Sequence, residues 1–201
     1  MEAKTYLRNA LQSKQPGLGF WCTPIIRVPW NEEWMIKRAL DSGAQGVMTP
    51  MCHNAADAKK IVSFSKYPPT GTRGYGPMFC PPVLGCKASE YDAQADEKLL
   101  VIVQIESRQG VDNVEEIAKV DGLDVLFIEH EAAIAKTLKA AHDAGKTAAI
   151  FCSNGQIAKQ RLDQGFDMVS IAVDNACLAA EMERQMGFVT GSTKAGDRSY
   201  S

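Results

Sequence analysis

The sequence predicts an α/β fold in the form of an incomplete TIM-type (β/α)8 barrel. Short apolar runs rich in β-branched residues alternate with helical patterns, which is typical of a parallel sheet, either in a barrel or in a doubly wound sheet. No G-x-G-x-x-G segment or phosphate loop follows any of these runs, which disfavours a doubly wound nucleotide-binding sheet. The chain has 201 residues and about six β-α units, whereas a closed eight-unit barrel takes about 250 residues. A barrel that lacks some of its units is therefore favoured.

The clearest predicted strand covers residues 101–106. Four of its residues are aliphatic, and charged or polar residues flank it, as in a fully buried parallel strand. Glu106 closes the strand at its carboxyl end, where the loops of a parallel barrel form the active site. A carboxylate there needs an ion pair, a hydrogen bond or a metal. Glu106 is the first candidate site residue; the alternative is a strand-end glutamate that contacts solvent or a structural arginine.

The remaining elements follow from periodicity and from cap and turn signals. A strand in residues 19–29 carries Arg27 near its end, so that Arg27, like Glu106, lies at a strand tip. Asn31 is expected to cap the first helix, and Asn54 or Asp57 to begin the second. Further strands are expected in residues 46–50, 123–128, 147–152 and 168–173, with helices in 111–120, 131–144, 157–162 and 175–186.

The domain organisation is simple. Residues 19–188 are expected to form one barrel domain, residues 1–18 an N-terminal arm, and residues 189–201 a disordered tail. Residues 67–84 are rich in proline, glycine and aromatic residues without periodicity, and a loop of that length in a compact domain is typically functional.

The composition argues against some partners and favours one cellular compartment. The net charge is −2 and no Lys/Arg-rich block is present, so nucleic acid is not an expected partner. No apolar run reaches the roughly 20 residues of a membrane span, and the first 20 residues lack the apolar core of a signal peptide. The six cysteines are scattered without zinc-type spacing, as in a reducing compartment. A cytoplasmic protein is expected.

Five motifs in order resemble the HpcH/HpaI aldolases, which are class II pyruvate aldolases of the phosphoenolpyruvate/pyruvate barrel superfamily. The resemblance runs from about Gly17 to about Met186. The motifs are Pro-Ile-Ile-Arg-Val-Pro-Trp-Asn at 24–31, Leu-Asp-Ser-Gly-Ala-Gln-Gly at 40–46, Thr-Pro-Met at 49–51, Tyr-Pro-Pro-Thr-Gly-Thr-Arg-Gly-Tyr-Gly at 67–76, and Gln-Ile-Glu at 104–106.

The resemblance implies an activity and a cofactor. It implies a divalent cation (Mg²⁺, Mn²⁺ or Co²⁺) that holds pyruvate, and reversible cleavage of a 4-hydroxy-2-oxo acid into pyruvate and an aldehyde. Glu106 matches the family's first metal-binding carboxylate, Gln104 resembles the glutamine beside it, and Arg27 matches the arginine that neutralises the keto oxygen or enolate. The alternative reading of Arg27 and Glu106 is a structural ion pair across the strand tips.

Two further residues carry expected roles. Asp41 resembles the family's aspartate that reaches the catalytic histidine of a neighbouring subunit, which implies a homo-oligomer or association with paralogous subunits. Arg73, in the long loop, is expected to contact an acidic substrate because of its position and charge.

The departures from the family also matter. The family's catalytic histidine segment is absent, because Gly-Phe-Trp runs almost directly into the Arg27 strand, and the family aspartate that supplies the second metal ligand is absent after residue 128. Both losses resemble internal deletions. Glu129 or His130 as replacement ligand, and His53 as replacement base, are disfavoured, and His142 is expected on the surface.

Three readings therefore remain. The first is a metal-dependent carbon-carbon lyase whose activity is impaired by these losses. The second is a catalytically inactive remnant that associates with intact aldolase subunits. The third is a chain that does not fold stably, because missing strands expose sheet edges.

Overall fold

The computed structural model describes residues 23–129 and 133–191. The chain divides into two compact units, Met1–Ala149 and Ile150–Ser201, and each is described by itself. The expected N-terminal arm, most of the expected tail and His130 lie outside the described residues.

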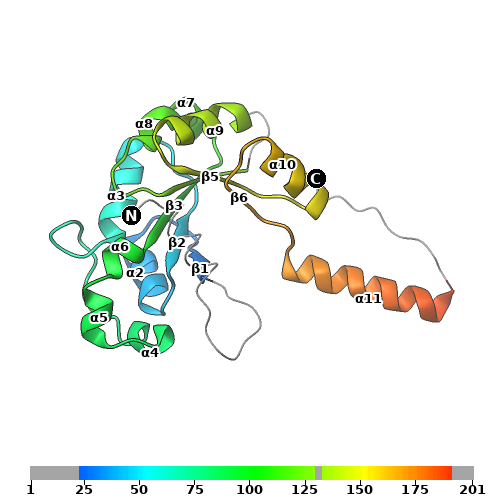
Figure 1. The fold of residues 1–201 in the computed structure, drawn as a ribbon, viewed down its shortest axis with the longest axis horizontal. Helices are drawn as coiled ribbons and strands as arrows, with labels where there is room; N and C mark the ends of the chain where they lie inside the picture. The colour runs from blue at the N-terminus through cyan, green and yellow to red at the C-terminus, as the bar shows by residue number, and fades with distance from the viewer. Residues whose placement is uncertain (1–22, 130–132, 192–201) are drawn as a thin grey trace. The chain divides into compact units, whose positions relative to one another are not determined.

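Parallel strands form the centre of the first unit and lie in the order of the sequence (Figure 1). The strands are β1 (Ile25–Arg27), β2 (Gly46–Thr49), β3 (Leu100–Ile105), β4 (Val125–Ile128) and β5 (Thr147–Ile150). Pairing from β1 to β4 is parallel, with Arg27 opposite Met48 and Ile105 opposite Ile128. All six residues of β3 are buried, as expected for a central strand.

Helices between the strands cover the sheet. They are α2 (Glu33–Asp41), α3 (Ala55–Ser65), α4 (Cys80–Leu84), α5 (Ala88–Asp92), α6 (Ala95–Lys98), α7 (Arg108–Asp112), α8 (Val114–Ala118) and α9 (Ile134–Asp143). Helix α2 packs on α3, α3 on α8, and α8 on α9. The core between helices and sheet consists of aliphatic side chains that are at most 2% exposed, among them Ile36, Leu40, Ile61, Val101, Val103, Ile117, Leu126 and Ile128.

The second unit contains α10 (Gly155–Asp163), β6 (Met168–Val169) and α11 (Asp174–Thr190). After β6, the Ser170 amide donates to the carbonyl of Ile150, the last residue of β5, at 3.2 Å. Helix α11 has no buried residue. Within the described part of the chain, no helix combines the length and apolar character needed to cross a membrane.

The predicted fold is confirmed: in residues 23–129 and 133–191, six strands follow one another in sequential order with helices between them, as in an incomplete TIM-type barrel. Two local expectations are wrong. Helix α2 begins at Glu33 with Glu32 at the N-cap and no side-chain cap, so Asn31 does not cap it. The helix expected over 111–120 is divided into α7 and α8 at Asn113, whose side chain donates to the His53 carbonyl at 2.9 Å.

Candidate active site

Four polar side chains meet at the carboxyl ends of three strands in the first unit. Arg27 is the last residue of β1, Gln104 the penultimate residue of β3, and Glu106 and Glu129 directly follow β3 and β4. Because Ile105 lies opposite Ile128, the same register places Glu106 opposite Glu129. Adjacent strands are about 4.8 Å apart, so the register alone brings the two carboxylates together. These four residues are called the strand-tip cluster below.

Gln104 connects the members of this cluster. Its side chain is 1% exposed. The Arg27 Nε donates to Gln104 Oε1 at 2.6 Å, and Gln104 Nε2 donates to Glu129 Oε1 at 2.5 Å. A buried amide with both ends bonded fixes the positions of its neighbours, since losing either bond would leave a polar group unsatisfied.

Glu106 is held from two sides. The Met51 amide donates to its Oε2 at 2.7 Å, and Arg27 Nη2 lies 3.8 Å from its Oε1. Met51 has φ 55°, a conformation that non-glycine residues rarely adopt, and this backbone directs its N–H at the carboxylate. The Arg27 side chain is 50% exposed and that of Glu106 15%. Within the cluster, Arg27 and Glu129 are thus exposed to solvent, whereas Gln104 is buried and Glu106 is mostly covered.

The pKa of the second carboxylate, Glu129, depends on the first carboxylate, Glu106. Burial raises the pKa of Glu129, and the hydrogen bond and negative charge of Glu106 raise it further, whereas Arg27 and the Gln104 hydrogen bond lower it. Two carboxylates in contact need a shared cation or proton, because two negative charges at that distance repel.

The donor set of the cluster fits a hard divalent cation. Carboxylate oxygens are the ligands that Mg²⁺-type ions prefer, and such ions use one or two protein carboxylates with water and substrate in the other positions. Arg27 supplies a permanent positive charge with forked donors, by which an anionic oxygen of a substrate would be held.

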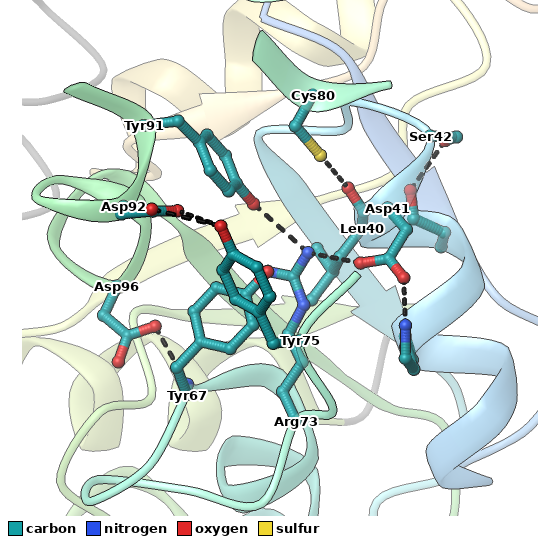
Figure 2. Close-up of polar contacts among 12 residues, drawn as sticks. Leu40, Asp41, Ser42, Tyr67, Arg73, Tyr75, Cys80, Tyr91, Asp92 and Asp96 are labelled. Carbon is teal, nitrogen blue, oxygen red and sulfur yellow. Dashed lines mark hydrogen bonds and ion pairs between the residues drawn. The ribbon is translucent and has the colours of Figure 1, made fainter. Parts of the chain in front are cut away.

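A second polar cluster surrounds the buried Arg73 (Figure 2). Its side chain is 2% exposed, and its Nη2 donates to Asp41 Oδ1 at 2.8 Å and to the Tyr91 hydroxyl at 3.2 Å. Lys37 pairs with the other oxygen of Asp41. The guanidinium carbon lies 4.4 Å from the centroid of the Tyr67 ring, a cation–π contact. Arg73 thus has a structural environment of one carboxylate and two tyrosines.

This second cluster lies at the amino ends of the strands. Arg73 lines a cavity of about 340 Å³ together with Gln45 and Leu99, which precede β2 and β3. Glu106 follows β3, and a strand of this length spans about 20 Å. The cavity is therefore not part of the strand-tip cluster.

The structure brings three of the predicted site residues together, Arg27, Gln104 and Glu106, and places Asp41 and Arg73 at the other end of the strands. Met51 and Tyr91 are among the participants that the sequence does not predict. The Met51 amide carries no side-chain signal, and Tyr91 lies in a polar stretch before β3. An aromatic residue in a polar stretch was the only sign of its burial.

Two of the three histidines, His53 and His142, lie in the described part of the chain. The His53 Nδ1 is 2.8 Å from the Ser107 hydroxyl, and its backbone N–H donates to Asp57 Oδ2 at 3.1 Å. These contacts connect His53 to the first turn of α3 and to Ser107, the N-cap of α7. His142 lies in the last turn of α9.

Comparison with known proteins identifies the family to which the sequence is similar. Residues 2–193 match the family model described as HpcH/HpaI aldolase/citrate lyase. A hydroxypyruvate/pyruvate aldolase of Chromohalobacter salexigens is 35% identical over 194 residues, covering 88% of this chain and 76% of the relative. A 4-hydroxy-2-oxo-heptane-1,7-dioate aldolase of Klebsiella pneumoniae is 34% identical over 178 residues, covering 80% and 67%.

Solved structures agree with these relatives. The crystal structure of an HpcH/HpaI aldolase/citrate lyase family protein from Burkholderia cenocepacia superimposes with a TM-score of 0.77 at 31% identity, covering 85% of this chain and 75% of that one.

Proposed function

Because this chain belongs to the HpcH/HpaI aldolase/citrate lyase family of class II aldolases, we propose that it cleaves a 4-hydroxy-2-oxo acid reversibly into pyruvate and an aldehyde, with the help of a divalent cation. The observation that supports this proposal is the contact of Arg27, Gln104 and Glu106 at the carboxyl ends of β1 and β3. This is the end of a parallel barrel where catalytic residues gather.

Each residue has a role that follows from its chemistry. The Glu106 carboxylate would hold the cation, whose positive charge would stabilise the enolate that carbon-carbon cleavage leaves on the pyruvate half. Arg27, which is half-exposed, binds the oxygen on which negative charge develops. Gln104 fixes the direction of Arg27 through the Nε hydrogen bond of 2.6 Å. Gln104 is thus a positioning residue.

Turnover is expected to be slow. The catalytic histidine segment of the family is missing from the sequence, and a positioned general base contributes roughly 10²- to 10⁴-fold to rate. We therefore expect kcat to lie about that factor below the values of full-length relatives, with the 4-hydroxyl proton leaving to solvent.

The test is release of pyruvate from 4-hydroxy-2-oxoheptane-1,7-dioate with added Mn²⁺, followed with lactate dehydrogenase. Arg27→Ala is expected to abolish the cation-dependent release, whereas Arg38→Ala, which removes an exposed arginine on α2, leaves it unchanged. Folding of each variant is checked by circular dichroism. A folded parent protein without cation-dependent release contradicts the proposal and favours the alternative, an inactive chain that associates with intact aldolase subunits.

A further inference from the structure

We infer that Glu129 is the second carboxylate ligand of the divalent cation, and that it takes the place of the family aspartate that this chain lacks. The inference rests on the proposed function and adds a residue to its site. Glu129 does not stand at the position after β4 where the family has its aspartate. The support for its role comes from contacts within this chain.

The strand register provides the first argument. Ile105 and Ile128 are partners in the parallel pair of β3 and β4, so Glu106 and Glu129, which directly follow these strands, continue the same register, and their side chains contact each other. Residues opposite each other in a parallel pair lie on the same side of the sheet. The two carboxylates therefore project from neighbouring strand tips toward one point.

The second argument is the orientation of the oxygens. Gln104 Nε2 holds Oε1 of Glu129 at 2.5 Å, and the Met51 amide holds Oε2 of Glu106 at 2.7 Å. Both donors are neutral, so neither compensates a charge. The two carboxylates also contact each other through a hydrogen bond, so a cation bound between them would replace the proton of that contact.

The third argument is that the available positive charge does not satisfy the pair. Arg27 Nη2 lies 3.8 Å from Glu106 Oε1, which is beyond hydrogen-bond distance, and the Arg27 Nε is used by Gln104. A Mg²⁺- or Mn²⁺-type ion between the two carboxylates would supply two positive charges and accept hard oxygen ligands. Its remaining positions would stay open for water and a 2-oxo acid.

The experiment measures Mn²⁺ binding without any substrate, from the loss of the free-ion signal in electron paramagnetic resonance. The variants are Glu129→Gln, Glu106→Gln and, as a matched control, Glu116→Gln, which removes an exposed carboxylate paired with Lys119. Glu129→Gln keeps an oxygen that can accept from Gln104, so a merely structural role of Glu129 would survive the change.

We expect Glu129→Gln and Glu106→Gln each to weaken Mn²⁺ binding at least about tenfold, and Glu116→Gln to bind like the parent. Glu129→Ala, with its fold checked by circular dichroism, is expected to weaken binding at least as much. Parent-like affinity in Glu129→Gln, together with a loss in Glu106→Gln, would overturn the role of Glu129 and leave the proposed lyase function standing. Absence of Mn²⁺ binding by the parent protein would overturn both.

Discussion

At the scale of single residues, Arg73 is a buried charge in the described part of the chain. Its guanidinium is almost fully buried, and Asp41 is the carboxylate that compensates its charge. Such pairs add little net stability compared with apolar residues, but breaking one leaves a buried charge without compensation. The polar groups around Arg73 therefore fix the conformation of the loop between α3 and α4.

We predict that Asp41→Ala lowers the free energy of unfolding by about 3–5 kcal/mol, because Arg73 then keeps a buried charge without its carboxylate. The measurement is urea unfolding followed by circular dichroism. Adding Arg73→Met to Asp41→Ala should cost less than the sum of the single changes. Glu116→Ala, at an exposed pair on α8, should leave the unfolding midpoint unchanged. Additive effects in the double variant would contradict this account of the pair.

A second prediction at this scale concerns Cys52. Its side chain is fully buried, and burial together with the charge of Asp57 raises the pKa of its thiol to about 12. The folded state therefore favours the protonated thiol, and stability is lost as the pH rises from about 9, the unfolded value, toward 12.

Alkylation by iodoacetamide at pH 8, with each site quantified by mass spectrometry, checks the consequence. Cys177, which is exposed on α11, is expected to react rapidly, whereas Cys52 stays unmodified until the protein is unfolded in urea. Reaction of Cys52 at a rate similar to that of Cys177 would show that its surroundings open readily.

Much of the strand-tip cluster could be predicted from the sequence, and the reasons differ between residues. Glu106 and Gln104 are two positions apart on an apolar strand, so their shared face follows from strand geometry. Glu129 could not be assigned with them, because its neighbour depends on the register between β3 and β4, which no local pattern determines. The burial of Arg73 was equally hidden, since arginine is usually exposed and its carboxylate partner lies 32 residues away.

At the scale of secondary structure, strands and helices alternate as predicted. The differences are the start of α2, the break at Asn113 that separates α7 from α8, and the short helices α4, α5 and α6, where the sequence predicts no helix. The β3 strand could be predicted because its short apolar run is flanked by charged and polar residues, which is typical of a buried strand. The α2 boundary was not, because Asn31 and Glu32 are both compatible with an N-cap, and only the backbone path after Pro29 decides between them. Local propensity is a weak guide where tertiary contacts fix the chain.

The two asparagines provide a matched test of capping. The Asn54 side chain accepts from the Asp57 amide at 2.9 Å at the start of α3, whereas Asn31 caps no helix. We predict that Asn54→Ala lowers the free energy of unfolding by about 1 kcal/mol, a typical loss for a helix cap. Asn31→Ala should change it by less than about 0.5 kcal/mol. Urea unfolding of both variants makes the comparison, and equal losses would argue against the cap.

At the scale of the whole molecule, helix α11 exposes a row of large apolar side chains. Helix α11 carries Leu178, Met182, Met186 and Val189 on one face, each between 58% and 81% exposed. Their spacing of three and four residues forms a continuous stripe along the helix. Exposed apolar patches of this kind mark interaction surfaces. The stripe supports the expectation, drawn from the resemblance of Asp41, that the chain works as an oligomer.

We predict that the purified protein self-associates and that Leu178→Glu with Met182→Glu shifts it toward the monomer, because a charge on an apolar contact is costly to bury. Size-exclusion chromatography with light scattering gives the mass at several concentrations. Ala180→Glu places one negative charge on the opposite side of α11 and should leave the mass unchanged. A parent protein that is monomeric at all concentrations would exclude self-association. An equal shift in both variants would show that charge on α11, rather than the stripe, controls assembly.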